Sequence, residues 1–322
     1  MWKYILKRLL MMIPVLLCVA ALIFTLMYFA PGDPASTISG GSATEEELNQ
    51  IREGLGLNRP FVVRLGDFFK TMIFEGSFGK SYIYGTDVMS EIIGRFKYTL
   101  ILAALGVSLC VLVGVPIGVR AAVKANTWED RVSMFVSLVG VSMPNFWLAL
   151  LLVLLFSLRL KLVPSSGIDS WKNFVLPLAA IVIANIAGMA RLARSSMLEV
   201  IRADYVTTAR SKGVSEHNVI YKHALPNALI PIITSIGGFF GGALGGTVVI
   251  ETIFSIPGLG LYLVNSINNR DYNAVQGCVI FLACTFSIVM LLVDIAYAYV
   301  DPRIKAQYVS AGKRKSTKKE AA

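Results

Sequence analysis

Six long apolar stretches restrict the fold of this chain more than any other feature of its sequence. None of them contains a charged residue, and they are Leu9–Ala30, Tyr98–Val119, Val132–Leu158, Asn173–Ala190, Pro226–Ile250 and Tyr272–Val293. A helix needs about 20 apolar residues to cross a bilayer core, where the backbone must satisfy its own hydrogen bonds. The sequence therefore predicts an all-α polytopic protein of the cell membrane with six transmembrane helices.

The first apolar stretch also has features of a signal peptide, because Lys3, Lys7 and Arg8 precede it. Its apolar part is longer than a typical signal-peptide core, however, and the sequence "YFAPGDPA" is a weak cleavage site. We therefore expect an uncleaved first span, with a cleaved signal peptide as the alternative.

Basic residues indicate which side of the membrane each loop occupies. With the N-terminus inside, the cytoplasmic segments hold 19 of the 30 lysine and arginine residues. The other 11 lie outside, 7 of them in the loop Pro31–Lys97, where nine acidic residues outnumber them. The positive-inside rule then puts both termini in the cytoplasm. The net charge of +10 follows from this topology, so we expect no nucleic-acid partner.

These boundaries divide the chain into four segments. Residues 1–30 form a cytoplasmic tail and the first span, and residues 31–97 an external loop subdomain. Residues 98–300 form a core of five helices that includes a cytoplasmic loop, 191–225, and residues 301–322 form a basic cytoplasmic tail. Within the external segment, Thr44 is expected to cap a helix that ends near Gly54.

The segment "EGSFGKS" ends like a phosphate-binding P-loop, but the pattern is incomplete. Gly79, Lys80 and Ser81 fit, whereas Phe74 stands where the first glycine must be. We therefore expect that the chain binds no nucleotide, cofactor or metal itself. All four cysteines (Cys18, Cys110, Cys278 and Cys284) lie in apolar runs, so we expect buried thiols rather than disulfides or metal ligands.

The fifth apolar stretch contains "GGFFGGALGG", which places glycines on two adjacent stripes of one helix. The first stripe is Gly237, Gly241 and Gly245, and the second is Gly238, Gly242 and Gly246. Such spacing allows close helix–helix packing in lipid. We expect this packing role, and a glycine-walled translocation path on the same face is compatible with it.

Ionisable residues are rare near the membrane interior. Glu251 and Asp294 lie at the ends of the fifth and sixth spans. Each could serve as an anchor at the membrane interface or have a functional role. Mid-span carboxylates, which an ion-coupled carrier needs, are missing. The spans also lack the Ser–His or carboxylate pair of an intramembrane protease, so we expect no enzyme.

The loop Arg191–Leu225 reads as two helices joined by a glycine. The run "SSMLEVIRADYVTTARSK" is expected to be one helix that Gly213 ends. Ser215 is expected to cap the next helix, and Pro226 suits the first turn of the fifth span. These residues alone are compatible with two interpretations of the loop. It could be a docking site for a partner protein, or it could be an amphipathic hairpin that lies on the lipid surface.

This loop resembles the EAA motif of permease subunits in binding-protein-dependent ABC importers. That motif reads Glu-Ala-Ala, three residues, Gly, nine residues, Ile, one residue, Leu-Pro. The matching positions are Ala209, Gly213, Leu225 and Pro226, and the departures are Thr207, Thr208 and His223. The spacing is intact.

Further stretches are similar to the dipeptide, oligopeptide and nickel permeases of that family. In "DYVTTARSKG", Asp204 and Tyr205 begin the version of the loop that those permeases carry. The segments "APGDP", "ETIFSIPGLG", "NRDYNAVQG" and "DPRIKA" are similar as well. The likeness extends from the first span to about residue 306.

The resemblance implies an assembly in the lipid bilayer. Two permease subunits, usually a heterodimer, would form the pore, two ATPase subunits would hold ATP and Mg, and an external binding protein would deliver di- or oligopeptides. The loop would lie in a groove of an ATPase, where Gly213 permits the turn and Ala209 a close approach, and Arg210 and Lys212 pair with acids. The alternatives are a permease for nickel or another small ligand and, more remotely, a stand-alone carrier or channel.

Overall fold

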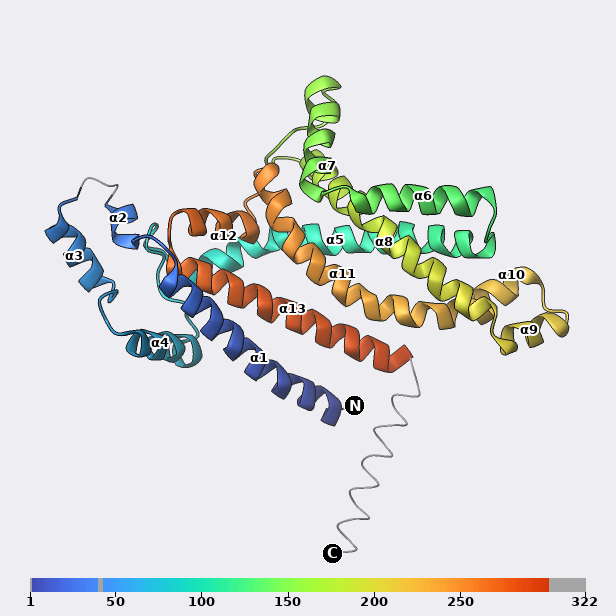
Figure 1. Cartoon of the computed structure of the whole chain (residues 1–322), viewed down its shortest axis with the longest axis horizontal. Helices are drawn as coiled ribbons and strands as arrows, with labels where there is room; N and C mark the ends of the chain where they lie inside the picture. The colour runs from blue at the N-terminus through green and yellow to red at the C-terminus, as the bar shows by residue number, and fades with distance from the viewer. Residues whose placement is uncertain (1, 40–42, 301–322) are drawn as a thin grey trace, which may run out of the picture.

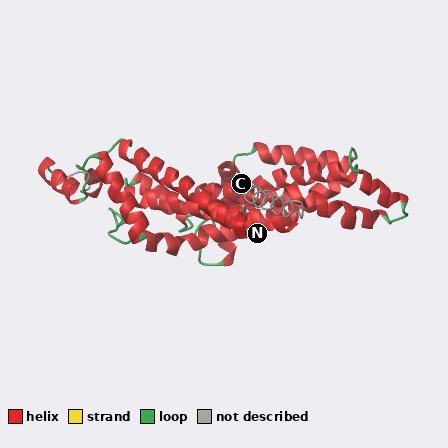
Figure 2. Ribbon diagram, turned by 90° about the horizontal axis from the view of Figure 1, so that it is seen from below, coloured by secondary structure: helices red, strands yellow, loops and turns green. Residues whose placement is uncertain are grey.

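The computed structural model of the protein describes residues 2–39 and 43–300, and every regular element in these ranges is a helix (Figures 1 and 2). The expected basic tail 301–322 lies outside the described residues. Five helices are long and apolar enough to cross a membrane, and a bent pair adds a sixth candidate. The five are α1 (Trp2–Phe29), α5 (Val88–Val123), α8 (Val175–Ile201), α11 (Leu225–Ile253) and α13 (Tyr272–Val300). The prediction of an all-helical polytopic protein is confirmed.

The expected continuous third span is wrong, because the structure divides it into two helices. Helix α6 (Trp128–Ser142) is followed by α7 (Asn145–Leu152) and the π-helical segment Val153–Arg159. The two halves meet at 98°, and α7 projects away from the other long helices in Figure 1. Pro144 lacks an N–H and forces the residue before it, Met143, into the extended conformation, so the helix ends there.

Helices α5 and α8 form the centre of the fold and approach each other through glycines. A Cβ atom added to Gly118 would lie 2.3 Å from the carbonyl oxygen of Ala190, and one on Gly106 would lie 2.6 Å from Ile181. Gly114 faces Met189 in the same way. Because these glycines of α5 carry no side chain, α8 can approach them at short range.

Helices α1 and α13 lie side by side (Figure 1). At the end where α1 begins, a guanidinium nitrogen of Arg8 lies 2.9 Å from a carboxylate oxygen of Asp294. The structure thus gives Asp294 a pairing role between two helices. Cys18 on α1 is exposed on the helix surface, in contrast to the buried thiol expected from the sequence.

The segment 31–97, which the sequence predicts to be external, contains three short helices that lie at one end of α1 and α13 (Figure 1). They are α2 (Pro34–Ile38), α3 (Glu45–Gly54) and α4 (Phe61–Lys70), with a π-helical turn at Thr71–Glu75. The expected helix after Thr44 is confirmed, since its hydroxyl accepts a hydrogen bond from the N–H of Glu47 in a capping box. Phe24 of α1 packs against Phe68 of α4 with ring centroids 5.3 Å apart.

A buried carboxylate fixes the loop after the π-helical turn onto the start of α13. Asp271 accepts hydrogen bonds from the hydroxyl of Ser81 and from the backbone N–H of Tyr82, the latter at 3.1 Å. Gly79 has φ +80° and lies against Asn273, whose amide donates to the carbonyl of Lys80 at 2.9 Å. The residues that imitate a P-loop therefore have a structural role.

Candidate functional site

The loop between α8 and α11 folds as two short helices and a π-helical segment. It comprises α9 (Asp204–Ser211), α10 (Glu216–Asn218) and Val219–Ala224, which continues into α11. This loop lies at the opposite end of the molecule from α2, α3 and α4 (Figure 1). The single helix expected up to Gly213 is wrong, because α8 ends at Ile201 and Ala203 is extended before α9 begins.

Gly213 makes the turn that the sequence predicts. Its φ is +78°, and its N–H donates to the carbonyl of Arg210 at 2.9 Å, while the N–H of Val214 donates to that of Ala209 at 3.3 Å. This left-handed glycine after a helix satisfies carbonyls at the helix end. A Cβ atom added at Gly213 would meet nothing within 4 Å, so the turn faces open space.

One face of the loop is buried in the protein's own core. Val206, Ala209, Val219, Ile220 and Ala224 form a cluster with residues of α5, α8 and α11. The break before α9 turns Val206 and Ala209 inward, so the small side chain of Ala209 serves packing within this subunit. The apolar face that a lipid-surface hairpin would present is already covered, and the loop is fixed to three long helices.

The other face of the loop is exposed and polar. Its predicted site residues are Asp204, Tyr205, Thr207, Thr208, Arg210, Lys212, Gly213, Ser215, His223 and Pro226. Arg210 already forms an ion pair with Glu216, with Nη2 and Oε1 2.7 Å apart. Among the described residues Lys212 forms no ion pair. Lys212 therefore offers an unpaired charge to a partner, as do the exposed side chains of Asp204 and Lys222, which likewise form no ion pair with the described residues.

The remaining predicted positions fix the ends of the loop. Ser215 precedes α10 as expected, but its side chain makes no capping hydrogen bond. The hydroxyl of Tyr205 accepts a hydrogen bond from Asn227 at 2.8 Å, which connects α9 to the start of α11. Leu225 packs against the buried cluster, and Pro226 lies in the first turn of α11 as predicted.

The two glycine stripes of α11 have different surroundings. A Cβ atom on Gly237 would lie 2.6 Å from the sulfur of Met290, and one on Gly241 2.3 Å from the ring of Phe286, both on α13. By contrast, Gly238, Gly242 and Gly245 have no other atom within reach, and Gly246 lies only near Asn145. The expected packing role thus holds for the first two glycines and not for the exposed face within this single chain.

Glu251, whose role the sequence leaves open, is fully buried at the end of α11. Its carboxylate accepts hydrogen bonds from the hydroxyl of Thr99 at 2.7 Å and from the N–H of Leu261 at 3.0 Å. Gly258 and Gly260 leave room for it, since a Cβ atom on either would collide with the carboxylate. Glu251 therefore holds the turn that leads into α12 (Leu259–Asn268), a helix that the apolar pattern does not predict.

Replacing Glu251 by alanine is expected to lower the free energy of unfolding by about 2–4 kcal/mol, because buried donors lose their acceptor. Glu251→Gln keeps the size and one accepting oxygen and should cost less. Thermal unfolding of the detergent-purified protein measures both. Glu199→Gln, at an exposed position on α8, is the control and should leave the transition unchanged. Equal transitions for wild type and Glu251→Ala would contradict this role.

The comparisons with known proteins agree with each other. Residues 114–306 match the family model described as "Binding-protein-dependent transport system inner membrane component", and residues 1–103 match the model of its N-terminal part. The chain is 42% identical over 305 residues to the glutathione transport system permease protein GsiC of Salmonella choleraesuis (strain SC-B67), covering 95% of this chain and 99% of the relative. The protein of the same name from Escherichia coli (strain K12) is 40% identical over the same length.

Solved structures support the fold. The "Inward facing conformations of the MetNI methionine ABC transporter" superimpose with a TM-score of 0.56 at 16% identity, over 66% of this chain and 97% of that chain. A second crystal form of the same transporter gives a TM-score of 0.55 at 17% identity, with the same coverage. The transmembrane core thus has the fold found in a transporter permease.

Proposed function

Because the chain belongs to the family of binding-protein-dependent transport system inner membrane components, and is thus a multi-pass permease of the cytoplasmic membrane rather than an enzyme, we propose that it imports short peptides. It would act as one of two pore-forming subunits of an ABC transporter. The second permease subunit is proposed to be a related but different chain, so that the pore is a heterodimer. ATP and Mg belong to the partner ATPases in this proposal.

The geometry of the loop 204–225 is the observation that supports the coupling proposal. Its exposed face offers a polar surface with unpaired charges, that of Lys212 among them, and its buried face is packed against α5, α8 and α11. A displacement of this loop by an ATPase would therefore move three long helices together. Such a rigid connection is what a nucleotide-driven change between inward- and outward-facing states requires.

The similarity to glutathione permeases supports a short peptide as the substrate. Glutathione is a tripeptide with free carboxylates, so it falls within the di- and oligopeptide class expected from the sequence. Nickel or another small ligand is the alternative substrate within the same family, and flux without an ATPase is the alternative mechanism.

The experiment that tests the proposal is uptake into proteoliposomes containing the chain with its partner subunits. We expect ATP-dependent uptake of labelled glutathione or dialanine in the presence of the binding protein, and background uptake when the ATPase lysines that bind phosphate are replaced. Uptake of nickel and not of either peptide would contradict the substrate. Uptake by the chain alone, without ATPases, would contradict the mechanism.

A further inference from the structure

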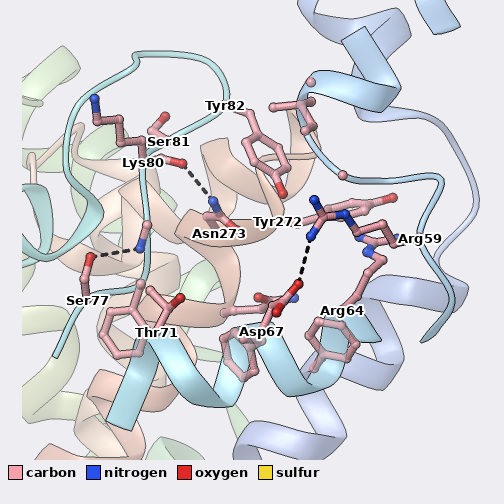
Figure 3. A pocket seen from close by; sticks show the side chains of 18 of the residues that line it. Arg59, Arg64, Asp67, Thr71, Ser77, Lys80, Ser81, Tyr82, Tyr272 and Asn273 are labelled. Carbon is pink, nitrogen blue, oxygen red and sulfur yellow. Dashed lines mark hydrogen bonds and ion pairs between the residues drawn. The ribbon is translucent and has the colours of Figure 1, made fainter. Parts of the chain in front are cut away.

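A cavity of about 540 Å³ lies in the external segment, at the far end of the molecule from the loop 204–225. Its walls come from α4, from the segments on either side of α4 and from the start of α13 (Figure 3). Figure 3 shows Arg59, Arg64, Asp67, Tyr82 and Tyr272 grouped at one end of this cavity, with Ser77 and Lys80 across from them. A volume of this size is in the range of small-molecule pockets, which is about 300–1,000 Å³.

Two polar groups of the cavity wall lack a partner among the described residues. Gln276 is 5% exposed and lines the cavity, and its amide makes no hydrogen bond to any residue that the structure describes. The hydroxyl of Tyr82 is likewise without a hydrogen bond there, and burial raises the pKa of Tyr82 to about 12. Tyr82 therefore stays neutral and able to donate. Both residues line the cavity, so their hydrogen-bonding capacity is available to a polar ligand bound there.

The charge of the cavity indicates the sign of that ligand. Three cationic side chains line it, Arg59, Arg64 and Lys80, against the single carboxylate of Asp67. The ion pair between Arg59 and Asp67, at 3.1 Å, compensates one of the three. Arg64 lies over the ring of Tyr28 and donates to the carbonyl of Leu57 at 3.3 Å, so its charge has no carboxylate partner among the described residues.

We propose that this cavity binds a small carboxylate-bearing molecule of dipeptide or tripeptide size. The guanidinium of Arg64 and the hydroxyl of Tyr82 donate to the carboxylate, as charge-assisted hydrogen bonds favour. The amide of Gln276, one turn along α13 from Tyr272, satisfies a peptide group deeper in the cavity. The site is separate from the loop 204–225, and its occupancy is independent of how transport is driven.

Binding to the full-length chain in lipid nanodiscs tests the proposal without any transport step. The probes are N-acetyl-dialanine, with a free carboxylate, and its C-terminal amide, titrated by calorimetry. We expect the acid to bind and the amide to bind at least about tenfold more weakly, since a hydrogen bond to a charged group contributes about 1.5–3 kcal/mol. Equal affinity for the acid and the amide would overturn the proposal.

Two variants separate the binding groups from effects on folding. Gln276→Glu is nearly isosteric and places a second negative charge beside the ligand, so the acid should bind at least about tenfold more weakly while the amide is less affected. Arg64→Gln should lower the affinity for the acid by a similar factor, because the carboxylate loses its charged donor. Lys70→Gln, at an exposed lysine of α4 outside the cavity, is the matched control and should bind normally. Unchanged affinity in Gln276→Glu would overturn the proposal.

A carboxylate in this cavity could also come from an external protein, either from its C-terminus or from an acidic side chain in a loop. A second titration therefore adds the binding protein instead of a peptide. If N-acetyl-dialanine competes with the binding protein in the wild type and this competition is lost in the Gln276→Glu variant, the cavity is supported as a carboxylate site. Binding of that protein without binding of either free peptide would overturn the assignment to a small molecule.

Discussion

Gly213→Trp is expected to reduce ATP-driven uptake to background and to prevent co-purification of the ATPase, while the protein still inserts and folds. The φ of +78° costs a residue with a side chain about 1–2 kcal/mol. No atom lies within 4 Å of the added Cβ, so the new side chain starts in open space. It would instead occupy the space in front of the exposed face that we propose to contact the ATPase. Proteoliposome uptake and affinity co-purification measure the two losses.

Gly213→Asn is the control for this prediction, because asparagine tolerates the left-handed conformation and has a short side chain. It should retain most of the uptake. The thermal unfolding transition of both variants should stay close to that of the wild type, which separates loss of docking from loss of fold. Full peptide uptake by Gly213→Trp would show that this turn does not contact the ATPase.

The second large effect is expected in the membrane core, at the contact between α5 and α8. Gly118→Leu should destabilise the protein by at least about 3 kcal/mol, the upper part of the range for overpacked cores. Its Cβ would lie 2.3 Å from the Ala190 carbonyl and 2.6 Å from the Ala193 side chain. Neither a backbone oxygen nor a Cβ atom can move without the whole helix, so α5 and α8 must separate. Thermal unfolding of the detergent-purified chain measures the effect.

Gly238→Leu is the matched control, since it makes the same change on another long helix. Its Cβ meets no atom within 4 Å, and the position is exposed in the single chain. The isolated chain carrying this change should unfold as the wild type does. Equal unfolding transitions for Gly118→Leu and Gly238→Leu would refute the short-range packing of α5 on α8.

The spans were predictable because their cause is local: a long apolar run must form a helix in lipid. The bend in the third span could be predicted only in part from the sequence. Pro144 is in the sequence, and a proline often ends a helix. Many membrane helices continue past a proline, however, because neighbouring helices satisfy the freed backbone groups. The 98° angle therefore depended on what packs around α6 and α7.

The loop 204–225 shows the same division between local and distant causes. The turn at Gly213 was predictable, because glycine adopts a positive φ at little cost. The end of α8 at Ile201 was not, since the helical pattern continues through it. The chain breaks there so that Val206 and Ala209 can join a core built by α5 and α8. Burial in that core outweighs the lost helical hydrogen bonds.

Glycine spacing predicted close packing in α11 but not its partner or its limits. Only the stripe of Gly237 and Gly241 contacts α13, and the other stripe is open in this chain. A comparable pair in α5, Gly114 and Gly118, has the same four-residue spacing, and it contacts α8. Spacing indicates that a helix can approach another closely, whereas the neighbouring helix decides which stripe is used.

The sequence by itself determined the helical membrane fold, the left-handed turn at Gly213 and the family, because each depends on residues close together in the chain. The tertiary structure alone decided the role of Glu251, the attachment of Ser81 to Asp271 and the cavity beside α4. Ser81 and Asp271 are 190 residues apart, and Thr99 and Glu251 are 152 apart. Polar groups at such separations come into contact only when the helices between them have packed. No local sequence pattern predicts such contacts.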